Sequence, residues 1–401
     1  METTTYKISD IGEVVGGGTP STANSDFWGG DIPWISPKDL TGYKSVYISH
    51  GESFLTKTGL KSGTRLLPKG TVLFSSRAPI GYVAIASNPI CTNQGFKSII
   101  CNKEIINPLF LYYYIKGNLD YIKLFGTGAT FPEISGAAMR KIKVQIPTLP
   151  TQQKIASILS SYDRLIENNT RRIRLLEQMA ENLYKEWFVR FRFPGHEKVE
   201  MVNGLPKGWE IKIIADFGRI ETGKTPPMSN RDLYGGDILF VKTPDMHGKM
   251  FVRSTSETLS QEGNNYQRAK LLPINSIMVS CIGTAGVVSI NTNLAHTNQQ
   301  INSIILNNLE DLEWLYYACR QLKPTIELFG ATGATMTNLS KGKFEKLKIV
   351  VPKVDFRGAF HKRIRPYFKE IYALEQQNTL LTRQRDLLLP RLMSGKLEVK
   401  S

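Results

Sequence analysis

The fold follows from a segment that occurs twice, as Asp26-Phe27-Trp28-Gly29-Gly30-Asp31-Ile32 and, 206 positions later, as Asp232-Leu233-Tyr234-Gly235-Gly236-Asp237-Ile238. Shorter matches keep the same order at nearly the same displacement: Thr19-Pro20 with Thr225-Pro226, Leu66-Leu67-Pro68 with Leu271-Leu272-Pro273, Thr92-Asn93-Gln94 with Thr297-Asn298-Gln299, Leu111-Tyr112-Tyr113 with Leu315-Tyr316-Tyr317, and Gly128-Ala129-Thr130 with Gly333-Ala334-Thr335. So long a period indicates a duplicated domain, because solenoid repeats recur every 20–50 residues or so. We expect such a chain to do the same job at two places.

The charge indicates a polyanionic partner. Fifty-one Lys and Arg against 35 Asp and Glu leave a net charge of +16 and a pI near 9.5. The N-terminal residues do not resemble a secretory signal, and the most apolar stretch, 276–290, is too short and too polar to span a bilayer. Nucleic acid in the cytoplasm is therefore favoured over a membrane surface, and a merely solvated basic surface stays open.

Each copy is predicted to end in a basic strand, 141–147 and 346–352, and a long amphipathic segment follows each strand. Apolar and a few polar residues recur there at steps of three and four: Ile166, Asn169, Ile173, Leu176, Ala180, Leu183 and Trp187, then Ile371, Leu374, Asn378, Leu381, Arg385, Leu388 and Leu392. This spacing is typical of a coiled-coil seam. Two such seams favour pairing with each other, and packing of each helix on its own domain is the alternative. We expect Thr151 to cap the first helix and Pro366 to start or kink the second.

The predicted architecture is domain, helix, domain, helix, with boundaries at 1–150, 151–197, 198–352 and 353–401. The domains are predicted to be α+β, with strands at 71–75, 81–86 and 277–281 and helices at 109–124 and 312–328. Helices of roughly 40 residues would be roughly 60 Å long. An antiparallel coiled coil of two such helices could hold two binding domains one turn of B-DNA apart, about 34–36 Å. The chain should then be a monomer with pseudo-two-fold symmetry.

One motif suggests a nucleotide site. Residues 218–225 satisfy the Walker A pattern GxxxxGK[ST]. A P-loop must open a helix, whereas Pro226-Pro227 follow here, and the first copy has Gly18 where Lys224 stands. A shared Gly-x-Thr-Pro turn, with Lys224 near a DNA phosphate, is favoured over ATP binding.

Catalytic and metal-binding patterns are missing from the sequence. There is no Asp/Asn-Pro-Pro-aromatic motif, GxSxG elbow or HExxH helix. The four cysteines form no CxxC pair and are expected to be buried free thiols, and the scattered histidines predict no metal site. We therefore expect no catalytic residues in this chain.

Several segments together resemble the specificity subunits of type I restriction–modification systems. They are the tract Pro150-Thr151-Gln152-Gln153-Lys154-Ile155-Ala156-Ser157-Ile158-Leu159 with its continuation through 163–169 to 186–189, the Gly-x-Thr-Pro turn, the Gly-Gly-Asp-Ile segment, the Gly-Ala-Thr loop, and Leu389-Pro390-Arg391-Leu392-Met393-Ser394-Gly395-Lys396-Leu397. The resemblance covers essentially the whole chain, in order and twice. It implies two target-recognition domains, each reading one half of an asymmetric bipartite DNA site.

The same resemblance implies partners and their cofactors. The two helices would be spacers that dock two modification (methyltransferase) subunits. Those partners would bind S-adenosylmethionine and methylate adenine, and a restriction subunit, if present, would use ATP and Mg. This chain would itself be non-catalytic.

Polar positions that differ between the copies are candidates for reading bases, because Arg and Lys suit guanine edges and Asn and Gln suit adenine. Examples are Arg77 opposite Ile282, Lys38 opposite Pro244, Lys97 opposite Asn302, and Gln300 opposite Gly95. The predicted DNA contacts are Lys38, Arg77, Asn93, Gln94, Lys97, Thr130, Lys224, Lys242, Asn298, Gln299, Gln300 and Thr335. The predicted spacer and partner positions are Ile166, Ile173, Leu176, Leu183, Trp187, Ile371, Leu374, Leu381, Leu388 and Leu392. For each DNA residue a phosphate contact, a solvated side chain or a turn is the alternative.

Two other functions stay open at this point. An autonomous NTPase or nuclease would show ATP- or metal-dependent activity in the isolated chain. A non-DNA assembly adaptor, whose basic faces would bind acidic protein, would show no salt-dependent affinity for DNA.

Overall fold

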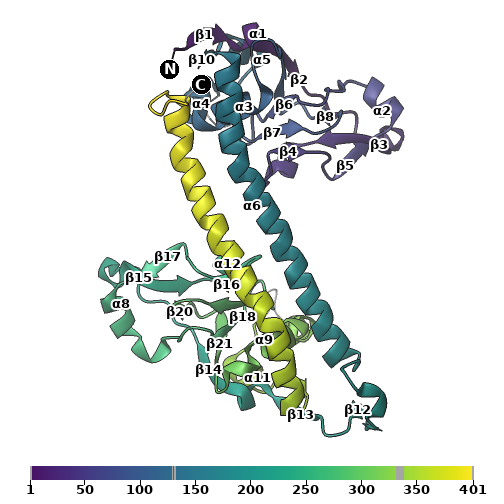
Figure 1. Cartoon of the computed structure of the whole chain (residues 1–401), viewed down its shortest axis with the longest axis vertical. Helices are drawn as coiled ribbons and strands as arrows, with labels where there is room; N and C mark the ends of the chain where they lie inside the picture. The colour runs from purple at the N-terminus through teal and green to yellow at the C-terminus, as the bar shows by residue number, and fades with distance from the viewer. Residues whose placement is uncertain (1, 129, 131, 331–337, 400–401) are drawn as a thin grey trace. The chain divides into compact units, whose positions relative to one another are not determined.

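The chain divides into two compact units that each hold one α+β domain and parts of two long helices. The computed structural model describes residues 2–128, 130, 132–330 and 338–399. Unit 1 comprises Met1–Arg171 and Glu375–Ser401, and unit 2 comprises Arg172–Leu374. The long helices are α6, Leu149–Tyr184, and α12, Val354–Met393, and both contribute to both units (Figure 1). The four-part segmentation follows chain order, and its boundaries stay predictions.

Three sheets form the domain of unit 1. The five-stranded sheet has the order β2-β9-β6-β7-β4, the three-stranded sheet β5-β3-β8, and β1 pairs with β10. Their bounds are β1 Thr4–Lys7, β2 Gly12–Gly16, β3 Trp28–Ile35, β4 Tyr47–Ile48, β5 Ser53–Leu55, β6 Val72–Phe74, β7 Val83–Ala86, β8 Cys91–Thr92, β9 Lys97–Cys101 and β10 Lys143–Ile146. Only the β4–β7 and β3–β8 pairs among these are parallel.

Short helices connect the strands of unit 1. They are α1 Ile8–Ile11, η1 Ser25–Phe27, η2 Pro37–Leu40, α2 Lys57–Lys61, α3 Pro108–Gly117, α4 Leu119–Lys123 and α5 Gly136–Lys141. Asn107 caps α3, because its side chain accepts from the amides of Leu109 and Phe110. The helix predicted at 109–124 is interrupted at Asn118, which has φ −119° and ψ 23°. The side-chain amide of Asn118 donates to the Tyr114 carbonyl over 2.9 Å.

Unit 2 repeats the topology of unit 1 strand for strand. Its sheets have the orders β14-β21-β18-β19-β16, β17-β15-β20 and β13-β22, and a hairpin β11-β12 precedes them. The strands are β11 Met201–Val202, β12 Leu205–Pro206, β13 Glu210–Ile213, β14 Gly218–Thr222, β15 Tyr234–Val241, β16 Phe251–Val252, β17 Glu257–Leu259, β18 Ile277–Ser280, β19 Val288–Asn291, β20 Ala295–Thr297, β21 Ile301–Leu306 and β22 Lys348–Val351. The helices are η3 Lys185–Val189, η4 His196–Lys198, η5 Ile214–Phe217, η6 Arg231–Leu233, α7 Thr243–Met246, α8 Gln261–Tyr266, η7 Arg268–Lys270, η8 Leu309–Asp311, α9 Leu312–Gln321, α10 Lys323–Gly330 and α11 Lys341–Glu345. The duplicated α+β domain predicted from the sequence is therefore confirmed.

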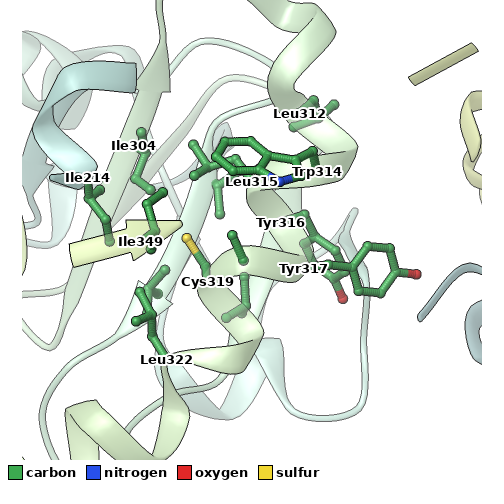
Figure 2. Packing of buried hydrophobic residues seen from close by; sticks show 14 of the residues in the cluster. Ile214, Ile304, Leu312, Trp314, Leu315, Tyr316, Tyr317, Cys319, Leu322 and Ile349 are labelled. Atoms are coloured by element: carbon green, nitrogen blue, oxygen red, sulfur yellow. The ribbon is translucent and has the colours of Figure 1, made fainter. Parts of the chain in front are cut away.

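Helix α9 joins the sheets of unit 2 to the long helices. Figure 2 shows Cys319 and Leu322 on the side of Ile349, and Trp314 lies fully buried in the same cluster. On the other side, the ring of Tyr317 lies 5.7 Å from Tyr184 of α6 and 6.0 Å from Phe368 of α12. The domain and the helix pair of this unit thus share one hydrophobic core.

The long helices run antiparallel in each unit. In unit 1, Asn169 of α6 donates to Gln377 of α12 over 2.9 Å, and Asp163, earlier in α6, pairs with Arg385, later in α12. In unit 2, Arg172 pairs with Glu370 over 2.6 Å, and the ring of Tyr184 lies 6.2 Å from that of Phe360. The predicted antiparallel pair of long helices is confirmed.

The predicted seam faces inward, toward both the other helix and the domains. All ten predicted spacer and partner positions are buried or half-buried: Ile166, Ile173, Leu176, Leu183, Trp187, Ile371, Leu374, Leu381, Leu388 and Leu392. Leu388 and Leu392 also pack against the domain core of unit 1, and Ile173, Leu176 and Leu183 against that of unit 2. The alternative of packing on the domains therefore holds alongside the pairing. Trp187 belongs to the π-helical turn η3 and not to α6.

The predicted start of the first long helix is wrong, and for Pro366 the structure excludes a helix start and leaves the predicted kink untested. Helix α6 begins at Leu149, so Thr151 lies inside its first turn, where its hydroxyl lies 3.1 Å from that of Thr148. Helix α12 begins at Val354, so Pro366 does not start it. In both cases the chain turns into the helix directly after the strand β10 or β22, before the polar residue or proline that the sequence pattern favours.

Candidate nucleic-acid interface

The Gly-x-Thr-Pro turn packs against the Thr-Asn-Gln loop in both units. The Gly18 amide donates to the Thr92 carbonyl over 2.8 Å, and the Lys224 amide donates to that of Thr297 over 2.9 Å. A Cβ on Gly17 would lie 1.9 Å from the Asn93 carbonyl oxygen. Only glycine fits such a close approach.

The Walker-like stretch is not a P-loop. Residues Gly218–Thr222 form β14, which pairs antiparallel with β21, and no helix opens at Lys224. A P-loop would present helix N-terminal amides to phosphate at this point. The expectation of a shared turn is confirmed.

The loop asparagines shape turns, which was the alternative to DNA contact. The side-chain oxygen of Asn93 accepts from the Gly95 amide over 2.9 Å, and that of Asn298 accepts from the Gln300 amide over 3.2 Å. Gln94 and Gln299 are exposed, and each accepts from the threonine of the adjacent turn, Thr19 or Thr225. The glutamines thus remain at the surface with free amide donors.

In unit 1 the structure brings Arg77, Gln94 and Lys97 together around Glu133, which the sequence reasoning missed. The Arg77 guanidinium lies 3.4 Å from one Glu133 carboxylate oxygen, and the Lys97 ammonium lies 3.2 Å from the other. Lys97 also donates to the Gln94 carbonyl over 3.3 Å. The side chains are 38%, 15% and 36% exposed for Arg77, Lys97 and Glu133, so the cluster lies at the surface.

The signal that could have found Glu133 was in the repeat. Glu133 stands opposite Asn338, and the β-bridge between Ile282 and Asn338 confirms that this position faces the one opposite Arg77. A charge present in one copy and missing from the other is the same criterion that selected Arg77.

The remaining candidates of unit 1 lie apart from this cluster. Lys38 is on η2 and pairs with Glu52 over 2.9 Å, and this hydrogen bond raises the pKa of Lys38. Thr130 is exposed in a bend. Both are open to solvent, as a phosphate contact requires.

In unit 2 most candidates contact other side chains of the same unit. The Lys224 ammonium lies 4.9 Å from the Tyr266 ring, and Lys242 pairs with Glu257 over 2.7 Å. Gln300 accepts from Thr243 over 3.3 Å and from the Asn298 amide over 3.2 Å. Thr335 lies outside the described residues.

Asn302, opposite Lys97, is not available to DNA. It is 3% exposed, accepts from the Thr222 hydroxyl over 2.6 Å and donates toward the Leu339 carbonyl. The strand pairing is the same as at Lys97 in unit 1. The Asn302 amide points inward because the pairing of β14 with β21 places Thr222 beside it. The Asn302 side chain is therefore held inside the domain by these two hydrogen bonds.

Other chemistry is sparse in the part of the chain that the structure describes. No three His, Cys, Asp or Glu side chains gather there in a way that could hold a metal ion. No helix of the described residues is long and apolar enough to cross a membrane. Cys91, Cys281 and Cys319 are buried free thiols, as expected, and Cys101 is partly exposed.

Comparison with known proteins decides the family. A model described as "Type I restriction modification DNA specificity domain" matches the chain twice, at residues 1–178 and 206–381. The chain belongs to this family. It is a specificity subunit of a type I restriction–modification system and has two DNA-recognition domains.

Relatives match this specificity subunit over most of its length. The type I restriction enzyme MjaIX specificity subunit of Methanocaldococcus jannaschii is 36% identical and covers 98% of the chain and 93% of the relative. The HindI specificity subunit of Haemophilus influenzae is 34% identical over 83% of the chain and 88% of the relative. The crystal structure of an S subunit from M. genitalium has a TM-score of 0.65 at 15% identity, covering 100% and 97%. The last comparison shows the shared fold.

Proposed function

We propose that each unit of this specificity subunit reads one half of an asymmetric, bipartite double-stranded DNA site. The observation that carries the proposal is that the two domains share one strand order and differ in the polar residues at one equivalent surface. Arg77, Lys97 and Glu133 in unit 1 stand where unit 2 has Ile282, Asn302 and Asn338. The strand order around them is the same in both units. Two identical scaffolds with different polar edges suit two different base sequences.

The net charge of +16 supports DNA as the partner, because Lys and Arg that neutralise phosphates supply most of the sequence-independent affinity. Lys38, Lys224 and Lys242 are proposed as phosphate contacts. Gln94, Gln299 and Gln300 are proposed to approach base edges. An adaptor whose basic faces bind acidic protein would instead show no salt-dependent affinity for DNA.

The long helices are proposed to set the gap between the half-sites and to dock two modification subunits. Exposed apolar side chains on α6 and α12 support this role, since they remain uncovered by the rest of their units: Leu165, Leu380 and Leu387 in unit 1, and Leu175 and Met179 in unit 2. Exposed apolar residues on an otherwise polar helix fit a protein partner.

The chemistry is proposed to lie in the partners. The modification subunits would bind S-adenosylmethionine and methylate adenine, and restriction subunits, where present, would use ATP and Mg. The chain itself would be non-catalytic and would act in the cytoplasm. The strand structure of the Walker-like stretch removes the one motif that favoured an autonomous NTPase.

The test is co-expression with the neighbouring candidate methyltransferase, a pull-down, and sequencing of methylated adenines. We expect a split motif with a fixed gap and two different halves. A palindromic motif, or no methylation although the complex forms, would contradict the proposal.

A further inference from the structure

A carboxylate lies between two cations at the surface of unit 1, among the proposed DNA contacts. Each oxygen of Glu133 serves one cation, Arg77 at 3.4 Å and Lys97 at 3.2 Å. A carboxylate near DNA is repelled by the phosphates and so weakens binding. The role of Glu133 therefore needs an explanation beyond charge balance.

The backbone of Glu133 is fixed on both sides. Its amide and carbonyl pair with the carbonyl and amide of Thr127 over 2.9 and 3.0 Å, and the amide of Ile134 donates to the Ser76 carbonyl over 3.0 Å. Ser76 immediately precedes Arg77, so the carboxylate and the guanidinium are held on adjacent, hydrogen-bonded segments. This geometry restricts the long Arg77 side chain before any DNA arrives.

Arg77 keeps most of its donors. A guanidinium has five N–H donors, and only Nη1 is engaged with Glu133. The remaining fork matches the O6 and N7 acceptors of guanine. A restricted arginine loses less side-chain entropy when it pairs with a base than a free one does.

The surface beside the pair is hollowed and largely apolar. Arg77 and Glu133 line a hollow of about 640 Å³ together with Ala78, Pro79, Ile80, Lys123 and Pro132. Apolar walls beside a hydrogen-bonding fork suit a base edge or a thymine methyl group better than a bare phosphate. Arg77 is therefore placed for base contact.

We infer that Glu133 is a positioning residue for sequence specificity: it holds Arg77 in the orientation that reads a guanine in the half-site of unit 1. This inference rests on the proposed function, and it assigns part of the sequence preference of unit 1 to the pair Glu133 and Arg77. Unit 2 has no counterpart, because Ile282 and Asn338 occupy the equivalent positions.

The test uses the full chain in complex with its modification subunits. DNA duplexes carrying every single-base substitution of both half-sites are bound to wild type, Glu133→Gln and Arg77→Ala. We expect Glu133→Gln to lower discrimination about 10-fold at the same one or two base pairs that Arg77→Ala affects. Affinity for unrelated DNA should rise, because one negative charge is lost.

Glu52→Gln is the matched control. Glu52 pairs with Lys38 in the same unit, and both side chains are well exposed, at 73% and 78%. The control should raise affinity for unrelated DNA in the same way and leave base discrimination unchanged. A purely structural or electrostatic role of Glu133 would make the two variants alike, which would overturn the inference.

Glu133→Asn keeps the test valid if Glu133→Gln folds poorly, since unit 2 carries Asn338 at this position of the same frame. It should reproduce the loss of discrimination. A bipartite wild-type motif with unchanged discrimination in both variants refutes the positioning role alone. A wild-type complex without a bipartite motif refutes the proposed function, and the inference falls with it.

Discussion

His296 of β20 is a buried titratable group in unit 2. It is fully buried, its Nε2 lies 2.9 Å from the Asn264 side-chain oxygen, and its Nδ1 has no partner. Burial lowers the pKa of His296 from 6.5 to about 4. The folded protein therefore holds this imidazole neutral, with Nε2 donating to Asn264.

This burial predicts a loss of stability in acid. Below about pH 6.5 His296 is protonated in the unfolded chain and stays neutral in the folded chain. The free energy of unfolding therefore falls as the pH drops toward 4 and levels off below it. The loss is at most about 3 kcal/mol. Amide hydrogen exchange of β20 and β15, corrected for intrinsic rates, should show weaker protection at pH 4.5 than at pH 7.

The control is His296→Cys, the residue that unit 1 carries at the equivalent position as buried Cys91. It should remove the part of the pH dependence that belongs to β20. Equal loss of protection in the variant and the wild type would show that His296 is not the group responsible.

At the level of single residues, the repeat predicted more than residue type did. Arg77 and Lys97 were found because their counterparts are different, and the structure brings them together. The asparagines of the Thr-Asn-Gln loops were ambiguous, because side-chain bonding to the nearby backbone and contact with DNA favour the same residue type. The inward turn of Asn302 depends on Thr222 of a neighbouring strand, a contact that sequence spacing does not specify.

The two units stabilise their helix pairs with different chemistry at equivalent positions. In unit 1, buried Asp163 of α6 accepts from Arg385 of α12 and from the Tyr113 hydroxyl of α3. Burial, and after it the negative charge of Asp163, raises the pKa of Tyr113. In unit 2 the equivalent positions are Phe368, Ala180 and Tyr317, all within one hydrophobic cluster. One packing arrangement thus has a polar and an apolar version.

The difference between the polar contact in unit 1 and the apolar contact in unit 2 predicts different stabilities for a single and a double variant. Arg385→Ala should destabilise unit 1 by about 3–5 kcal/mol, because it leaves the Asp163 carboxylate buried without its cation. The double variant Asp163→Phe with Arg385→Ala copies unit 2 and should recover most of that loss. Urea denaturation of the full chain measures both. A double variant as unstable as the single one would contradict the proposed equivalence.

At the level of elements, the spacing of apolar residues predicted the long helices, whereas single residues did not predict where helices begin or break. Steps of three and four located both long helices, because a helix pair must keep one stripe inward along its whole length. The break at Asn118 involves a local side-chain bond, from the Asn118 side-chain amide to the Tyr114 carbonyl. Such bonds are decided by tertiary packing.

At the level of the whole molecule, the two domains are one duplicated fold that differs at its polar surface. The strand orders of the two domains are the same, and the charged edge around Glu133 has become neutral in the second copy. The length of the period identified the duplication directly from the sequence. Which residues form each edge could not be predicted in the same way, because a surface cluster leaves no periodic pattern.

The central claim is that each domain reads its own half-site, and making the two domains alike tests it most directly. Residues 4–146 would be replaced by residues 210–351, which run over the equivalent strands β1–β10 and β13–β22. This chain would be co-expressed with the modification subunits, and the methylated motif would be sequenced beside that of the wild type. The account predicts a site with two identical halves, both matching the half that unit 2 reads, with the gap unchanged. A motif that keeps the original unit 1 half, or one that matches neither wild-type half, would contradict it.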